Sequence, residues 1–327
     1  MDRKEQGTNP PHSRSTRTTR KARREIRQTT KSIQAVIAIV VGVVIAIVAG
    51  MSSPAFTLNK RLFDPATYSR IRSVWFGDLP ATATTVPFEY GKKWFGAGLP
   101  EEKTAFDNTC ATSFGDALAS IGPDKYALPP LNVGGNSTYA AELAHASSIA
   151  APFAQALTDA AAGAGDIRAG EEAAADTALS LVLLLDQMSR NIFRKDQKAV
   201  YSHYDRISRS VLRHVLETSP RADLHPKWRA SPAYRLWFYM PLMHSEFVED
   251  HRRYEELVGE MVGELQRGGD TEAVEYAQKS LDFEVKHREI LDRFGRYPHR
   301  NEVMGRTMTK EEKEWLEAGG ETFGTKG

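Results

Sequence analysis

The chain has 327 residues, enough for one or two domains, and its 43 basic side chains nearly balance its 42 acidic ones. The balance hides an asymmetry, because residues 1–32 hold 10 Lys or Arg and 3 Asp or Glu, a net charge of +7, which leaves the remainder at −6. An acidic body argues against a nucleic-acid-binding domain. Cys110 is the only cysteine, which excludes an intrachain disulfide and a cysteine-based metal cluster.

Residues 33–51 form an apolar segment directly behind the basic arm 1–32, with Gln34 as its one polar side chain. A helix of this length rises about 28 Å, close to the hydrocarbon thickness of a bilayer. We therefore predict a single-pass transmembrane helix, with a disordered arm that stays in the cytosol because it is positively charged. A secretory-pathway membrane is favoured. The alternatives are a mitochondrial inner membrane and a cleaved signal peptide.

Two further patterns bear on the membrane prediction. Ala38, Gly42, Ala46 and Gly50 recur every four residues, so that small side chains share one helix face and would allow a homodimer to form. Asn136 opens an N-S-T sequon, which would be available for glycosylation if the body faces a lumen.

After a juxtamembrane linker, residues 52–67, the body at 68–323 shows helical periods and caps and few strand signals. Residues 120–176 are rich in Ala and Gly and are interpreted as an insertion, with a linker at 163–170 and a helix broken or kinked at Pro152. The pattern predicts an all-α, antiparallel helical bundle. The expected helices cover 65–76, 100–120, 139–162, a buried helix around 179–185, helices beginning at 196 and 231, and helices at 245–267, 270–294 and 310–319.

Three stretches resemble the domain-of-unknown-function 924 family: LSLVLLLDQMSRNIFR at 179–194, FYMPLMHSE at 238–246, and HREILDRFGRYPHRNEVMGR at 287–306. An upstream WFG that begins at Trp75 fits the opening of this family. The resemblance covers most of the body and implies a tetratricopeptide-like fold. It implies no reaction, because none is assigned to the family, and the membrane segment lies outside its pattern.

The same stretches place ionisable side chains beside strongly apolar helices, where charges are costly unless they are paired or bind a ligand. We predict that these side chains meet in one polar cluster. The candidate ligand-binding residues are Asp186, Arg190, Asn191, Arg194, His244, Glu246, His287, Arg296, His299, Arg300, Asn301 and Arg306.

Three interpretations of this cluster remain open. A purely structural network would pair Asp186 with Arg190, and Glu246 with Arg296 or Arg300. The surplus of arginines instead favours a small anionic ligand or a peptide carboxylate, because guanidinium groups bind both in bidentate fashion. A hydrolase-like enzyme would use His244, Glu246 and His299 as acid and base. A protein-interaction scaffold is a further alternative. No recognised ligand spacing predicts a metal or a cofactor.

Overall fold

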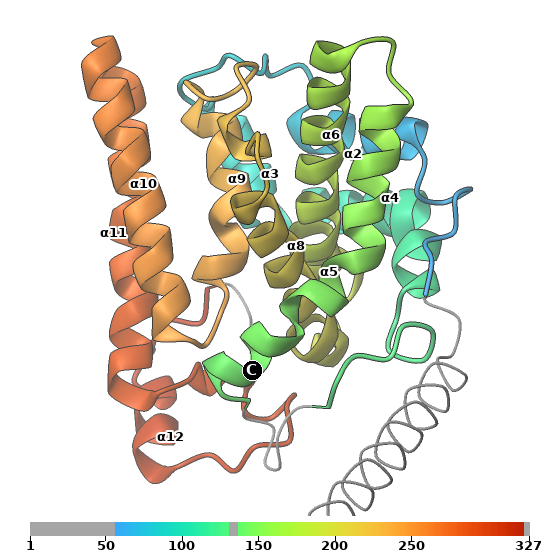
Figure 1. Cartoon of the computed structure of the whole chain (residues 1–327). Coiled ribbons are helices and arrows are strands. Elements are labelled where there is room, and N and C mark those ends of the chain that lie inside the picture. Colours follow the sequence, from blue (N-terminus) through green and yellow to red (C-terminus); the bar gives the residue numbers. More distant parts are fainter. Residues whose placement is uncertain (1–55, 131–136, 324–327) are drawn as a thin grey trace, which may run out of the picture. The chain divides into compact units, whose positions relative to one another are not determined.

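The computed structural model describes residues 56–130 and 137–323, and these residues form helices and connecting turns without a strand, as predicted for an all-α body (Figure 1). The α-helices are α2 (Pro65–Phe76), α3 (Phe88–Phe95), α4 (Pro100–Ser120), α5 (Tyr139–Ala162), α6 (Ile167–Val182), α7 (Ser189–Ile192), α8 (Asp205–Glu217), α9 (Pro232–Met243), α10 (Val248–Gly268), α11 (Thr271–Phe294) and α12 (Lys310–Glu317). Two π-helical turns, η1 (Leu183–Met188) and η2 (Val200–Tyr204), and two 3₁₀ turns, η3 (Ala222–Leu224) and η4 (Pro298–Arg300), complete the set.

Local capping chemistry explains why several helices begin where the sequence predicts. The side chain of Asp64 accepts a hydrogen bond from Thr67 N at 2.7 Å, and Pro65 takes the first helical position, where no backbone donor is needed. Near the other end of the chain, Thr309 and Glu312 form a capping box at the start of α12, the helix predicted at 310–319. Both helix starts are therefore confirmed.

The Ala-rich helix α5 continues through Pro152 and packs along α6 and α8. The linker predicted at 163–170 is shorter than expected, because α6 already begins at Ile167. Asp166 caps this helix by accepting a hydrogen bond from Ala169 N at 2.9 Å. The expectation for 163–170 was wrong because it gave the glycines more weight than the Asp cap.

The core is built around one long helical segment made of α6, η1 and α7. Its leucines from Leu179 to Leu185 are fully buried, which confirms the predicted central helix. A cluster of tryptophans, with Trp75 and Trp94 both in edge contact with Trp237, joins the N-terminal helices to α9. The segment is not a regular α-helix, because it widens to π geometry at η1, a feature often found at functional sites.

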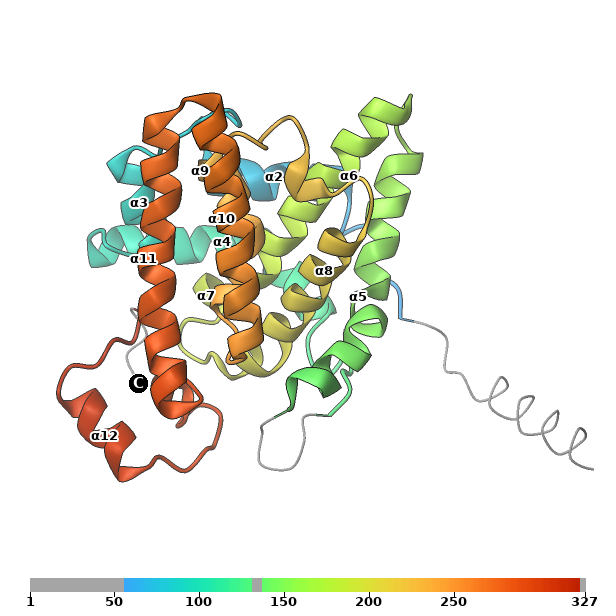
Figure 2. The ribbon, with the colours of Figure 1, turned by 60° about the vertical axis from the view of Figure 1, so that its left-hand side comes forward.

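Helices α10 and α11 form an antiparallel pair that packs beside α9 (Figure 2). Gly269, in the left-handed conformation with φ of +78°, allows the tight turn between them. Helix α11 ends at Gly295, also left-handed, and the chain then turns back through η4 towards the start of α10. This return brings the third sequence stretch against the second.

The predictions about the membrane fall on residues outside the described part of the chain. These are the helix at 33–51, its small-residue face and the sequon at Asn136. Among the described residues, no helix is both long enough and apolar enough to cross a bilayer.

Candidate functional site

Asp186 lies on the π-helical turn η1 and is completely buried. Its two carboxylate oxygens each lie 3.0 Å from Nδ1 of His244, the residue that ends α9. Burial alone would raise the pKa of Asp186, but the neighbouring basic side chains of His244 and Arg190 outweigh it and lower the pKa. Burial and the charge of Arg190 lower the pKa of His244. Asp186 is therefore an anion, and it accepts a hydrogen bond from a neutral imidazole.

Arg190, one turn further along the same helix, joins Asp186 to α8. Its guanidinium donates to both carboxylate oxygens of Asp205, at 2.8 and 3.0 Å, and lies 3.4 Å from Oδ1 of Asp186. The predicted pairing of Asp186 with Arg190 is thus confirmed. The shorter contacts of the guanidinium, however, go to Asp205, which the sequence did not single out. Asp205 follows directly after the second π-helical turn, η2.

Asn191 and Arg194 point away from this group and face α4. Arg194 forms a bidentate pair with Asp107, with Nη2 at 2.7 Å from Oδ1, and also donates to Oδ1 of Asn191 at 2.9 Å. The amide nitrogen of Asn191 lies 3.8 Å from Sγ of Cys110. These two predicted site residues therefore belong to a separate packing contact between α7 and α4.

Glu246 binds the turn that follows α11. Its carboxylate accepts two hydrogen bonds from Arg306, at 2.7 and 2.9 Å, and one from the backbone of Tyr297 at 2.8 Å. Burial would raise the pKa of Glu246, but these hydrogen bonds and the nearby arginines lower it. The structural interpretation paired Glu246 with Arg296 or Arg300, and this pairing was wrong, because sequence spacing does not show how the turn folds back.

The side chain of Arg296 binds to α12 and to the turn before it. It donates to both oxygens of Glu312, at 2.6 and 2.8 Å, and to the carbonyl of Thr307 at 2.9 Å. The hydrogen bond from Arg296 is the main reason that the pKa of Glu312 falls to about 2. Asn301 is fully buried nearby, and its side-chain amide has no hydrogen-bond partner among the described residues.

His287 and His299 are packed as aromatic rings. His287 stacks on Phe323 with ring centroids 3.6 Å apart, and its Nδ1 lies 2.8 Å from the carbonyl of Phe283. His299 stacks on Tyr297 at 5.5 Å, and its Nδ1 has no hydrogen-bond partner among the described residues. Burial lowers the pKa of both histidines to about 3, so both are neutral at physiological pH.

A pocket of about 350 Å³ opens where α5, α8, the α9–α10 junction and the turn after α11 meet. Four of the twelve predicted residues line it: His244, Glu246, Arg296 and Arg300. The sequence analysis missed most of the remaining lining. The sequence contained one signal for these residues: the charged pair at 205–206 directly follows the apolar start of a helix. The other lining residues include Tyr139, Glu142, Tyr201, Asp205, Arg206, Arg209, Ser245, Phe247, Glu249 and Met304.

Arg300 is the one predicted cation in this pocket without a bidentate carboxylate partner among the described residues. Its side chain forms only a 3.8 Å ion pair with Asp205, which is already bound to Arg190. The guanidinium carbon lies 4.4 Å from the ring centre of Tyr201 and 4.6 Å from that of Tyr297. Its Nε is buried and has no partner in the described chain. Arg300 therefore retains unused hydrogen-bonding capacity.

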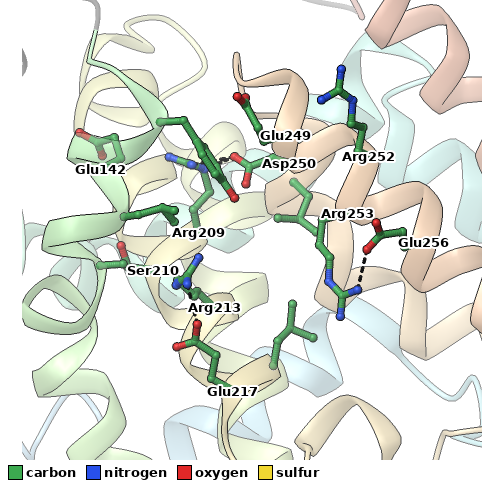
Figure 3. Close-up of a pocket in the computed structure, with 15 residues that line it drawn as sticks. Glu142, Arg209, Ser210, Arg213, Glu217, Glu249, Asp250, Arg252, Arg253 and Glu256 are labelled. Carbon is green, nitrogen blue, oxygen red and sulfur yellow. Dashed lines mark hydrogen bonds and ion pairs between the residues drawn. The ribbon is translucent and has the colours of Figure 1, made fainter.

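A second pocket of about 500 Å³ adjoins the first and runs between α5, α8 and α10 (Figure 3). Figure 3 shows that Arg209, Arg213 and Arg253 each pair with a carboxylate. Arg209 Nε donates to Asp250 Oδ2 at 2.7 Å and so joins α8 to α10. Four residues line both pockets, so the two pockets adjoin, and we refer to them together as the groove. They are Tyr139, Glu142, Arg209 and Glu249.

The described residues contain no group of three or more His, Cys, Asp or Glu side chains placed to hold a metal ion. The pocket lining includes Arg300 and His244, the partner of Asp186. Arg300 offers hydrogen-bond donors and a positive charge. The pair offers a neutral imidazole whose Nε2 no described residue engages.

The family described as "Bacterial protein of unknown function (DUF924)" matches residues 71–320. The chain belongs to this family. The match confirms the resemblance found in the three sequence stretches, and no reaction is assigned to the family. Among solved structures, the chain is similar to a protein of unknown function from Agrobacterium tumefaciens, with 22% identity and a TM-score of 0.40, over 77% of this chain and 98% of that one. The search of curated proteins gave no match.

Proposed function

We propose that this family member binds a small anionic ligand in the pocket at Arg300. The supporting observation is the state of that side chain: it lies in the pocket wall, is 7% exposed, and is without a strong carboxylate partner in the described chain. A buried charge that lacks such a partner is costly. An anion supplied by a ligand would offset the cost.

The surroundings of Arg300 favour a planar or tetrahedral anion that approaches the edge of the guanidinium group. Tyr201 and Tyr297 lie within 4.4 and 4.6 Å of its central carbon and cover it with aromatic rings. A ligand would therefore be recognised by the N–H donors along the edge of the Arg300 guanidinium group. Carboxylates and phosphates match this edge geometry, because two of their oxygens accept parallel hydrogen bonds.

Inorganic phosphate and benzoate, added separately at constant ionic strength, test the proposal by thermal denaturation. At ten times its dissociation constant, a bound anion stabilises the folded state by about 1.4 kcal/mol. For a body of this size, such a gain raises Tm by about 3–6 °C. We expect at least one of the two anions to produce this shift and Arg300→Met to abolish it.

Arg296→Met is the matched control, because Arg296 lines the same pocket but its guanidinium is occupied by Glu312. This variant should melt at a lower temperature without ligand, yet keep the shift that the anion induces. The proposal is refuted if neither anion stabilises the native protein, or if Arg300→Met keeps the full shift.

The sequence also supports a proposal about location, namely that residues 33–51 anchor the protein in a secretory-pathway membrane with residues 1–32 in the cytosol. The protein should then remain in the pellet after alkaline carbonate extraction, and endoglycosidase should increase its gel mobility unless Asn136 is replaced by Gln. Release into the carbonate supernatant would contradict the anchor. A homodimer through the 38–50 face is part of this proposal, and Gly42→Ile should dissociate it.

A tetratricopeptide-like stacking of the helix pairs is proposed on the family resemblance. A scaffold that binds other proteins along the groove is the competing use of such a fold. The two pockets support this alternative, since the groove is lined by charged side chains of both signs. Arg300 favours the small-ligand proposal over the scaffold, because the unused hydrogen-bonding capacity lies on a single buried side chain.

A further inference from the structure

His244 lines the proposed anion pocket, and the fully buried Asp186 behind it gives the pair the geometry of a general base. Both carboxylate oxygens of Asp186 lie 3.0 Å from Nδ1 of His244, and Asp186 has no exposed surface. The other ring nitrogen, Nε2, has no hydrogen-bond partner in the described chain, and His244 lines the pocket together with Arg300.

This arrangement determines which nitrogen carries the proton. Because the Asp186 carboxylate only accepts hydrogen bonds, the neutral imidazole carries its proton on Nδ1 and has a lone pair on Nε2. When Nε2 takes up a proton, the buried carboxylate stabilises the imidazolium that forms. His244 is thus oriented and electrostatically prepared to accept a proton from a molecule in the pocket.

We propose that the pocket hydrolyses a small ester that carries a carboxylate, with Arg300 binding the carboxylate and His244 acting as the general base. This inference rests on the proposed function, because Arg300 must first hold the anion. It assigns Asp186 the role of a positioning residue. Neither Glu246 nor His299 takes part: Glu246 is bound to Arg306 and Tyr297, and His299 does not line the pocket.

In the proposed step, Nε2 of His244 removes a proton from a water molecule while the water oxygen forms a bond to the ester carbonyl carbon. The tetrahedral anion then collapses, and the bond between that carbon and the alcohol oxygen breaks. The leaving alkoxide takes the proton back from His244. One ester and one water therefore give one acid and one alcohol, and His244 returns to its neutral form.

An ester suits this site better than an amide. General base catalysis by a single side chain typically contributes about 10²- to 10⁴-fold, which is modest against the stability of an amide bond. Ser245 follows His244 in the sequence, and its hydroxyl could be considered as a nucleophile. That residue is almost fully buried, and its hydroxyl accepts a hydrogen bond from Phe247 N at 3.1 Å. Water is therefore the nucleophile in the proposed step.

The test uses 4-acetoxybenzoate, an ester whose carboxylate lies across a benzene ring and does not attack the ester itself, with release of 4-hydroxybenzoate as the readout. Phenyl acetate, which lacks the carboxylate, is the paired substrate. We expect the full-length protein to hydrolyse 4-acetoxybenzoate well above the buffer rate. His244→Gln should lower kcat/KM by about 100-fold or more, while His145→Gln, an exposed histidine on α5, should leave it unchanged.

Two further variants separate chemistry from binding. Arg300→Met should lower kcat/KM for 4-acetoxybenzoate and leave phenyl acetate unaffected. Asp186→Asn should lower kcat with little change in KM and also shift the pH profile, which a purely structural residue would not do. The charged and titratable groups around His244 are Asp186 on η1, Arg190 on α7, Asp205 on α8 and His287 on α11. Because burial and Arg190 lower the pKa of His244, activity should persist below pH 6.5.

Each outcome decides one of the two proposals. If benzoate stabilises the native protein through Arg300 but 4-acetoxybenzoate is hydrolysed no faster than in buffer, the catalytic inference is wrong and the binding proposal stands. Equal turnover by His244→Gln and the native protein would also overturn the inference. If neither benzoate nor phosphate produces a shift, and Arg300→Met hydrolyses 4-acetoxybenzoate as fast as the native protein while hydrolysis depends on His244, the binding role of Arg300 is wrong.

Discussion

Arg206 and Arg300 line the same pocket and are equally buried, with 7% of each residue exposed, yet their surroundings are opposite. Arg206 lies on α8 and donates to both oxygens of Glu142, at 2.9 and 3.0 Å, and to the carbonyl of Pro129 at 2.8 Å. Arg300 lies on the η4 turn and has one ion pair at 3.8 Å. The comparison shows that burial alone does not identify a functional charge. The ligand proposal rests instead on unused hydrogen-bonding capacity beside a pocket.

The same contrast extends to the regions that hold the two arginines. Around the helical core, ion pairs such as Arg194 with Asp107 and Arg206 with Glu142 satisfy both partners. Between residues 299 and 306, by comparison, His299 Nδ1, Arg300 Nε and Arg306 Nε are buried without a partner in the described chain. Buried donors of this kind cost free energy. Their concentration in one turn beside a pocket favours a functional interpretation of that turn.

The largest effect is expected from Arg206→Met. Removing the cation leaves the Glu142 carboxylate buried and unpaired, which should lower the free energy of unfolding by about 3–5 kcal/mol. Urea denaturation measures the loss. The double variant with Glu142→Gln should recover much of it, because no buried charge then remains unpaired. Equal losses in the single and double variants would contradict the ion-pair explanation.

A smaller, pH-dependent effect is expected from His287. Because burial lowers its pKa to about 3, the unfolded chain binds a proton between pH 6.5 and 3 that the folded chain excludes, so stability falls as the pH drops through this range. The loss should be about 2 kcal/mol from pH 7 to pH 5. His287→Phe should remove that share in urea denaturation at the two pH values, while His145→Gln should not. An unchanged pH dependence in His287→Phe would contradict the explanation.

The fold was largely predictable where local chemistry sets helix ends. Asp270 and Gly295 delimit α11 as expected, since the Asp270 side chain caps Ala273 N at 2.9 Å and Gly295 adopts a left-handed conformation. The site was less predictable, because its contacts join distant segments. Glu246 and Arg306 are 60 residues apart, and nothing in their spacing selects Arg306 over Arg300. The π-helical turn at Asp186 likewise has no recognised sequence signal.

Arg296 offers a further test of the contrast between paired and weakly paired arginines. Its ion pair with Glu312 is less buried than the ion pair between Arg206 and Glu142. Arg296→Met should destabilise the fold by about 1–2 kcal/mol, because it removes a bidentate ion pair and exposes the α12 capping box to competition with water. The hydrogen bond from Arg296 lowers the pKa of Glu312 to about 2, so this contribution is present above pH 4.5 and is lost as the pH falls towards 2. Urea denaturation at pH 7 and pH 3 should show the variant and the native protein converging in acid. A constant difference between them would contradict this link.

The smallest effect on stability is expected from Arg300→Met, although this variant should have the largest effect on ligand binding. Replacing a weakly paired buried cation with an apolar side chain of similar length removes a desolvation cost, and the new side chain packs between Tyr201 and Tyr297. We expect the free energy of unfolding to change by less than about 1 kcal/mol, or to rise. A loss comparable to that of Arg206→Met would show that Arg300 is a structural ion-pair partner, and the contrast between the two arginines would no longer support a ligand site.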